Sequence, residues 1–416
     1  MLKSGISVFL EYRTSFIPTE HAKNIAGTMD RALSHVLASS DVLVNRANFM
    51  SERNRSQIER WNSKPLEPDL RTIHGMIADV AAKLPNHEAV CAWDGNFTYE
   101  QLHQYASKLA SYLILQGVGP DVIVPLCFEK TKWNVVAMLG VLIAGGACKC
   151  SLPLLQIMSS SLFPSQRTSP LKYYMPYMLN ELFFTCLNCY YKRLTHILVL
   201  PLDPTVPRER IQHLVNASNA RIVLCSLRHM ETLQAVAEII APVDPDFLDN
   251  LPEVSQHQQS TATSDNLAYI IPTSGTTGQP KLTCIEHGNY CTNVKGHVPG
   301  IKVDAVKPIR VLQFATHSFD ASIIEILTPL MIGGTTCIPD EHARLNDVAK
   351  VINDMRVTWA SLTPTFVRFL EPSMVPTLAS IVLMGEAMSQ ANLDTWSQIN
   401  LINGYANFPT FAYLVC

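Results

Sequence analysis

The sequence predicts an α/β protein whose mostly parallel, doubly wound sheets carry helices on both faces. Two observations support this fold class. Short apolar stretches of strand length recur from about residue 70 onward, and stretches with helical spacing separate them. That alternation is typical of a parallel sheet covered on both sides. The strands are expected at residues 122–128, 221–225, 268–272, 310–314, 357–362 and 380–384.

Near the N-terminus, helices are expected where apolar residues recur every three or four positions. The first covers residues 19–39, and Thr19 can cap it. A shorter helix follows Ser51, after which Pro65 and Pro68 mark a linker.

Two further helices flank the first strand of the main part. An apolar stripe over residues 102–113 ends at Gly117, a residue type that often closes a helix. After the strand at 122–128, a helix through Val135–Leu142 runs into Gly145.

Length and composition indicate a globular protein of two or three domains, with 416 residues, 47% hydrophobic content and a net charge of −3. This charge gives no reason to expect nucleic acid or an anionic membrane as a partner. Eleven cysteines, an odd number without a regular framework, favour a reduced, cytoplasmic setting. Neither a small-residue cleavage site nor a long uncharged apolar stretch occurs, so no secretory signal or membrane span is expected.

Residues 149–199 break the alternating pattern. Glu181 is the only acidic residue there, and apolar residues follow no sustained period. A long structureless stretch inside a compact domain is unusual. Cys186 and Cys189 have no second ligand pair at suitable spacing, which disfavours a zinc or redox site.

The strongest chemical signal is the segment TSGTTGQPK, which follows an apolar strand ending at Pro272. Its two glycines let backbone N–H groups approach an anion, its hydroxyls add donors, and its lysine adds a positive charge. A Walker loop needs adjacent Gly and Lys, so a kinase or GTPase loop is disfavoured, and a polar surface turn is the alternative. The expected phosphate-binding residues are Thr273, Ser274, Gly275, Thr276, Thr277, Gly278 and Lys281.

A second candidate site begins at Asp320, which opens a predicted helix. Its carboxylate could pair with a substrate ammonium group, or it could only complement the helix dipole. Val382 and Met384 lie two positions apart on a predicted strand and therefore point to one face.

The segment TSGTTGQPK resembles the signature loop of the adenylate-forming superfamily, which includes acyl-CoA synthetases, luciferases and peptide-synthetase adenylation domains. Further motifs, in the family's order, resemble those of nonribosomal peptide synthetase adenylation domains. They are FTYEQL (97–102), LIAGGAC (142–148), PLDPTVPRERI (201–211), FDASIIEIL (319–327) and LMGEAM (383–388). The stretches LEYRTSFI and MSERNRSQIERWN resemble the tail of a condensation domain and its linker.

This resemblance implies a condensation-domain tail and linker over residues 1–64, an AMP-binding core over 65–405 and an off-family end over 406–416. It implies that an amino acid and ATP give aminoacyl-AMP and pyrophosphate with Mg²⁺. The aminoacyl group would then pass to phosphopantetheine on a carrier domain that is not in this chain. The implied partners are an amino acid and the carrier and condensation domains of a peptide synthetase.

The resemblance also assigns site residues. Asp320 would bind the substrate α-ammonium group, and Asn403 and Tyr405 would contact adenine. Small or apolar residues would line the side-chain pocket, which implies an L-α-amino acid with an uncharged side chain. These lining residues are Ala321, Ile324, Ser361, Val382, Met384 and Gly404.

The chain departs from the family after Tyr405. The family continues Gly-Pro-Thr-Glu, with a metal-holding glutamate, whereas this chain reads Ala-Asn-Phe-Pro over residues 406–409 and ends at Cys416. No counterpart of the small C-terminal lid domain and its catalytic lysine follows. We therefore expect no catalytic and no metal-binding residue in this chain, and no activity from the chain alone. The alternatives are a non-catalytic remnant that binds ATP or amino acid weakly and an acyl-CoA-synthetase-like ligase.

Removing residues 149–199 would join Cys148 to Leu200 and give GGACLPLDP, close to the family's motif. The segment is therefore interpreted as translated intron sequence or, if it belongs to the protein, as a disordered insertion. His287 and His317 lie near the predicted site in sequence and are candidates for ligand contact.

Overall fold

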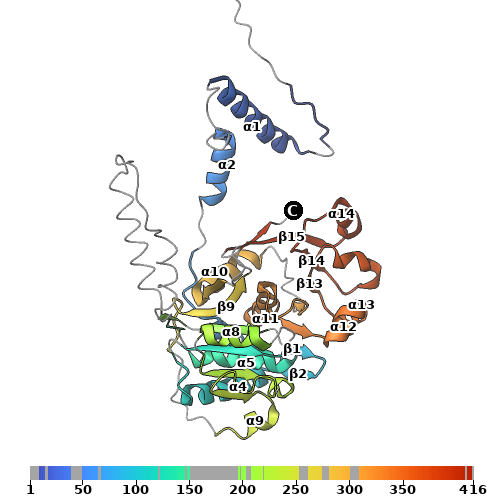
Figure 1. The fold of residues 1–416 in the computed structure, drawn as a ribbon. Helices are drawn as coiled ribbons and strands as arrows, with labels where there is room; N and C mark the ends of the chain where they lie inside the picture. Colours follow the sequence, from blue (N-terminus) through green and yellow to red (C-terminus); the bar gives the residue numbers. More distant parts are fainter. Residues whose placement is uncertain are drawn as a thin grey trace, which may run out of the picture. The chain divides into compact units, whose positions relative to one another are not determined.

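The computed structural model describes residues 9–14, 17–38, 49–63, 67–119, 122–145, 148–149, 195–196, 198–202, 208–218, 220–252, 261–273, 281–299, 309–407 and 410–414. The chain divides into two units, Met1–Glu67 and Pro68–Cys416, which are described separately (Figure 1). Among the described residues, no helix is both long and apolar enough to cross a membrane.

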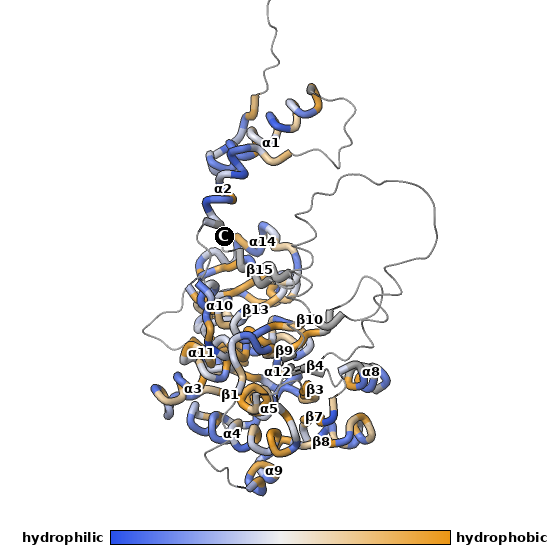
Figure 2. Tube along the Cα trace, turned by 90° about the vertical axis from the view of Figure 1, so that its left-hand side faces the viewer, coloured by the Kyte–Doolittle hydropathy of each residue, from blue (hydrophilic) through white to orange (hydrophobic). Residues whose placement is uncertain are grey.

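The first unit contains the two helices expected from the sequence, α1 (Thr19–Ala38) and α2 (Glu52–Asn62). The Ser51 hydroxyl caps α2 by accepting a hydrogen bond from the Asn54 backbone N–H at 3.1 Å. The Asn54 side chain in turn donates to Thr28 Oγ1 at 2.8 Å and so ties α2 to α1. Figure 2 shows that α2 is mostly hydrophilic. The apolar row of α1 is 40–69% exposed and consists of Ile25, Met29, Leu33, Val36 and Leu37.

The larger sheet of the second unit has eight strands in the order β16-β15-β14-β13-β11-β12-β1-β2. Its inner strands pair in parallel, and the two outermost strands pair antiparallel with their neighbours. The strands are β1 (Glu88–Ala92), β2 (Gly95–Thr98), β11 (Arg310–Leu312), β12 (Thr335–Ile338), β13 (Trp359–Leu362), β14 (Ser380–Leu383), β15 (Asn400–Asn407) and β16 (Thr410–Leu414).

The second sheet has six strands in the order β10-β9-β6-β3-β7-β8. Its pairs are parallel except for β9 with β10. The strands are β3 (Ile123–Cys127), β6 (Leu198–Leu202), β7 (Ile222–Cys225), β8 (Ile239–Pro242), β9 (Leu267–Thr273) and β10 (Lys281–Glu286).

Helices pack between and around these sheets. The largest core cluster includes Val90 of β1, Leu126 of β3 and Ile323 of α11, so the helices in it join the two sheets. Helix α5 is buried on nearly all sides and is among the hydrophobic elements in Figure 2, as expected for a helix inside the core. The helices are α3 (Ile73–Lys83), α4 (Tyr99–Leu115), α5 (Lys132–Ala144), α8 (Arg208–Ser218), α9 (Pro245–Asp249), α10 (His287–His297), α11 (Asp320–Ile332), α12 (Glu341–Asn346), α13 (Val348–Asp354) and α14 (Gln390–Trp396).

The predicted fold class is confirmed. All six expected strands are present, as β3, β7, β9, β11, β13 and β14. The stripe over residues 102–113 lies in α4, which a capping box at Thr98 begins and which is followed by Gly117 at φ +82°. Gly145, at φ +67°, closes α5. The described residues at the C-terminus form the antiparallel pair β15–β16.

Two buried histidines pack against each other where α3 meets α10. The ring centroids of His74 and His287 are 5.3 Å apart, and His287 Nδ1 accepts a hydrogen bond from the Ile73 backbone N–H at 3.1 Å. His287 Nε2 and His74 Nδ1 make no hydrogen bond within the described residues. Burial lowers the pKa of His74 to about 4 and that of His287 to about 3. His287 therefore supports the start of α3 as a neutral ring.

The two ends of the segment that breaks the alternating pattern, residues 149–199 (the anomalous segment), lie side by side. Strand β4 (Cys148–Lys149) pairs antiparallel with β5 (Thr195–His196), with Lys149 opposite Thr195. Strand β6 follows at once and pairs with β3, with Val199 opposite Val124. If Cys148 were joined to Leu200, Cys148 would take the register position of Val199. Residues 150–194, most of the anomalous segment, lie outside the described residues.

Shortening the chain between β4 and β5 tests whether the segment contributes to the fold. Paired strands lie about 4.8 Å apart, a gap that a turn of two to five residues closes. We expect that replacing residues 150–194 by a four-residue Gly/Ser turn leaves one cooperative thermal unfolding transition. A matched variant that replaces residues 198–202 by the same turn removes a central strand and should abolish that transition. Loss of cooperativity in the first variant would show that the fold needs the segment.

The buried histidines predict a loss of stability in acid. Because the folded-state pKa of His287 lies below the usual 6.5, the unfolded chain binds a proton first as the pH falls. Stability should therefore be complete above pH 6.5 and decline as the pH falls from 6.5 to about 3. We expect His287→Gln to flatten this decline by up to about 1.4 kcal/mol per pH unit in urea unfolding. His342→Gln, at an exposed position on α12, is the control and should keep the original slope.

Candidate functional site

The predicted phosphate-binding segment joins two paired strands. Thr273 ends β9 and Lys281 begins β10, and the two residues lie opposite each other in the antiparallel register. The expected apolar strand before the loop is thereby confirmed. Ser274, Gly275, Thr276, Thr277 and Gly278 lie outside the described residues, so their part in phosphate binding stays a prediction.

Asp320 is the first residue of α11, as predicted. Its Oδ1 accepts a hydrogen bond from the Ala321 backbone N–H at 2.8 Å, and it forms no ion pair within the described part of the chain. Burial raises the pKa of this half-buried carboxyl group above its usual value. Since the charged form lacks a cation, an approaching ammonium group would be favoured there.

The predicted lining residues meet at the carboxyl ends of neighbouring strands. Ser361 of β13 lies opposite Val382 of β14 in the parallel register, so both face the same side of the sheet. Gly404 lies on β15, where an added Cβ would be 2.7 Å from Val382 Cγ1 and 3.2 Å from Met384 Cβ. Only glycine fits this close approach. Asn403 lies beside Leu383 in the register with β14.

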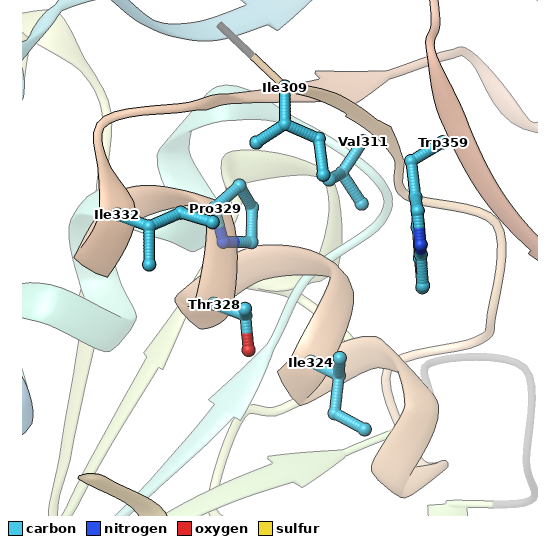
Figure 3. Close-up of a pocket in the computed structure, with 7 residues that line it drawn as sticks. All are labelled: Ile309, Val311, Ile324, Thr328, Pro329, Ile332 and Trp359. Atoms are coloured by element: carbon cyan, nitrogen blue, oxygen red, sulfur yellow. The ribbon is translucent and has the colours of Figure 1, made fainter. Parts of the chain in front are cut away.

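Ile324 joins this region from α11. It lines a small apolar cavity between α11 and the strands, with Ile332 and Pro329 on the helix side and Val311 and Trp359 opposite (Figure 3). Val311, Trp359 and Val382 belong to one buried cluster, against which Met384 packs. Two residues that line the cavity therefore pack in the same cluster as Val382, one of the predicted lining residues. The remaining lining residues are Ile309 and Thr328.

Trp359 was not among the predicted site residues. It is 2% exposed, and its indole N–H has no hydrogen-bond partner among the described residues. Its position could have been noticed in the sequence, because Trp359 lies two residues before Ser361 and therefore on the same face of β13.

A buried lysine holds the segment that leads from β11 to Asp320. Lys130 Nζ donates to Gln313 Oε1 and to the Ala315 carbonyl oxygen, both at 2.5 Å. Glu325 Oε2 accepts from the Ala315 backbone N–H at 2.9 Å and from Gln313 Nε2 at 3.3 Å. Burial lowers the pKa of Lys130 to about 7 and raises that of Glu325 to about 8. These bonds connect Lys130, shortly after β3, with the segment that follows β11, and hence the two sheets.

His317 lies in the segment between β11 and Asp320 and helps to hold it in place. Its ring nitrogens lie 3.3 Å from the Phe128 carbonyl oxygen and 3.3 Å from Asn134 Nδ2. Burial lowers the pKa of His317 to about 3, so the ring is neutral. Nδ1–H then donates to Phe128, and Nε2 accepts from Asn134. Both ring nitrogens are occupied by the protein, which gives His317 a supporting role like that of His287.

The residues expected to bind adenine are only partly described. Asn403 and Tyr405 lie on β15, and the Tyr405 side chain falls outside the described part. Among the described residues, no group of three or more His, Cys, Asp or Glu could hold a metal ion.

Substitution of Lys130 tests the connection between the sheets. Lys130→Met leaves Gln313 Oε1 without its donor, removes one of the two donors to the Ala315 carbonyl oxygen and leaves Glu325 without a nearby cation. We expect a loss of at least about 2 kcal/mol in urea unfolding. Lys350→Met removes an exposed lysine paired with Asp354 at 2.5 Å and serves as the control, with little expected change. Equal effects of the two substitutions would contradict the connecting role.

Comparisons with known proteins agree with this architecture. Relatives include nonribosomal peptide synthetase 1 of Aspergillus fumigatus, 41% identical over 97% of this chain, and nonribosomal peptide synthetase 4 of Gibberella zeae, 36% identical over 97%. The chain spans only 6% and 5% of these two relatives.

Solved structures share the fold at lower identity. A crystal structure of the nonribosomal peptide synthetase FmoA3 matches 95% of this chain and 38% of its own, with a TM-score of 0.69 and 19% identity. The N-terminal subdomain of Klebsiella oxytoca NpsA in complex with 3-hydroxyanthranilyl-AMSN matches 83% of this chain and 75% of its own, with a TM-score of 0.63 and 18% identity.

The family model for AMP-binding enzymes matches residues 77–156 and 195–406, and it passes over residues 157–194. The matched residues cover the smaller sheet, the larger sheet apart from β16 and the last residue of β15, and the region around Asp320. On this evidence, the chain belongs to the AMP-binding enzyme family.

Proposed function

We propose that this chain is an amino-acid adenylation domain of a nonribosomal peptide synthetase. In this reaction a carboxylate oxygen of the amino acid attacks the α-phosphorus of ATP, and pyrophosphate leaves. The observation that carries the proposal is Asp320, a half-buried carboxylate that forms no ion pair among the described residues and begins α11, the helix whose Ile324 lines the apolar cavity. A fatty or aryl acid has no ammonium group, so this carboxylate disfavours an acyl-CoA-synthetase-like ligase.

Different site residues would bind different parts of the amino acid and of ATP. Asp320 would bind the α-ammonium group, and the pocket around Ile324, Val382 and Gly404 would take an uncharged side chain. Residues 273–281 would hold the β- and γ-phosphates through backbone N–H groups, hydroxyls and Lys281. Asn403 and Tyr405 would contact adenine.

Mg²⁺ would accompany ATP and offset the charge of its phosphates. The position of the family's metal-holding glutamate is Pro409 in this chain, which has no oxygen-bearing side chain. Proline therefore cannot supply the oxygen ligand that the family's glutamate gives to the metal.

Partners are proposed on the same basis. Residues 1–64 would be the tail of a condensation domain with its linker, and a carrier domain would receive the aminoacyl group on its phosphopantetheine thiol. The relatives are peptide synthetases many times longer than this chain, which supports a multidomain setting. We propose a cytoplasmic location for the whole.

The test is amino-acid-dependent exchange of labelled pyrophosphate into ATP with each proteinogenic L-amino acid. Binding of each amino acid, with ATP and Mg²⁺ present, is measured in parallel by calorimetry. Exchange supports an adenylating enzyme and would contradict the expectation that the chain alone is inactive, whereas binding without exchange supports a non-catalytic remnant. The same two assays are run with fatty and aryl acids. Exchange or binding with these acids alone would overturn the proposal.

Asp320→Asn should weaken binding of the responding amino acid about 10- to 100-fold, because a charged hydrogen bond of about 1.5–3 kcal/mol is lost. ATP affinity should stay unchanged. Glu100→Gln removes an exposed carboxylate from the first turn of α4 and is the matched control, without effect on either ligand. Equal binding by the Asp320→Asn protein would remove the ammonium-binding role.

A further inference from the structure

Two cysteines outside the proposed site face each other across neighbouring strands. Cys91 of β1 and Cys337 of β12 are direct partners in the parallel register. Val90 and Ile338, next to them along the strands, belong to the largest core cluster, whereas Cys337 belongs to a different cluster against which Cys91 packs. Both thiols therefore project from the same face of the sheet.

The two thiols differ in their exposure to solvent. Cys337 is fully buried, and its Sγ lies 3.8 Å from the Met355 carbonyl oxygen. Cys91 is only partly buried, and its neighbour across the sheet on β2 is the exposed Asn96. A reagent from solvent thus meets Cys91 first.

A cation completes the cluster. Arg310 of β11 donates through Nε to the Met355 carbonyl oxygen at 2.7 Å, the same oxygen that lies near Cys337 Sγ. Its Nη1 forms an ion pair with Glu88 Oε2 at 2.6 Å. The charged groups facing the thiols are Arg310, which favours a thiolate, and Glu88, which opposes it.

The balance favours a thiolate at Cys91. The neighbouring Cys337 thiol and Arg310 lower the pKa of Cys91 to about 7, and the same contact raises the pKa of Cys337. By contrast, burial raises the pKa of Cys225 and of Cys291 to about 12. A thiolate is the nucleophilic form of cysteine.

We propose that Cys91 and Cys337 form an oxidisable dithiol in which Cys91 reacts first and Cys337 resolves the product. With hydrogen peroxide as oxidant, the Cys91 thiolate takes one oxygen atom and becomes sulfenic acid while hydroxide leaves. The Cys337 sulfur then attacks the Cys91 sulfur, a disulfide forms, and water is released. Register partners on parallel strands lie about 4.8 Å apart, within the Cα separation of about 4.4–6.8 Å that a disulfide allows.

The first experiment treats the full, folded chain with hydrogen peroxide, blocks the remaining thiols, digests the protein and searches for the linked peptides by mass spectrometry. After treatment we expect a Cys91–Cys337 disulfide in the unsubstituted chain and dimedone-trapped sulfenic acid at Cys91 in Cys337→Ala. Oxidised Cys91 without any link to Cys337, or linkage of Cys91 mainly to another cysteine, would overturn the proposal.

The second experiment follows alkylation of Cys91 by iodoacetamide, in which an S–C bond forms and iodide leaves, between pH 5.5 and 9. The rate should rise with a midpoint near pH 7, while Cys225 and Cys291 stay unmodified. Cys337→Ala should slow labelling at pH 7 at least about tenfold, and Cys337→Ser, which keeps an O–H donor, should restore most of the rate. Cys225→Ala is the control and should leave Cys91 labelling unchanged. An unaltered midpoint in Cys337→Ala would refute the role of the partner thiol.

Discussion

The hydrogen bonds of one buried lysine connect the two sheets at the ends where the candidate site lies. Lys130 follows a strand of the smaller sheet, and its acceptors follow a strand of the larger one. Glu325 and His317 add bonds to the same short segment from α11 and from within it. Asp320 begins the next helix, so the position of its carboxylate depends on these buried polar contacts. A partly satisfied network would leave strong acceptors without donors inside the core.

Burial sets the charge of several groups in this chain, with different consequences. At His74, His287 and His317 it favours the neutral ring. The ring of His74 then bonds to the Thr72 hydroxyl, that of His287 to a backbone N–H, and that of His317 to a carbonyl oxygen and a side-chain amide. At Asp320 it disfavours a carboxylate that forms no ion pair with any residue the structure describes. A ligand ammonium group would relieve that penalty, whereas the histidines already have their preferred state. Burial therefore gives the three histidines supporting roles, whereas it makes Asp320 a candidate binding residue.

The two ends of the anomalous segment, residues 149–199, lie next to each other in the fold. Strands β4 and β5 bring its two ends together, and β6 then supplies a central strand of the smaller sheet. The family match resumes at the same point in the chain. Because the free-energy cost of closing a loop rises only slowly with its length, the pairing of β4 with β5 is compatible with a short or a long connection.

By itself, the sequence determined the alternation of helices and strands, the capped start of α4, the strand before the phosphate-binding segment and the position of Asp320 at a helix start. These features depend on residues close together in the chain, so local spacing and capping reveal them. The tertiary structure decided the rest. It placed Trp359 beside Ile324, required glycine at position 404 because Val382 and Met384 lie so close, and gave His287 and His317 supporting roles. It also put Cys91 opposite Cys337. Each of these depends on strand register and on burial by distant residues, which no local pattern encodes.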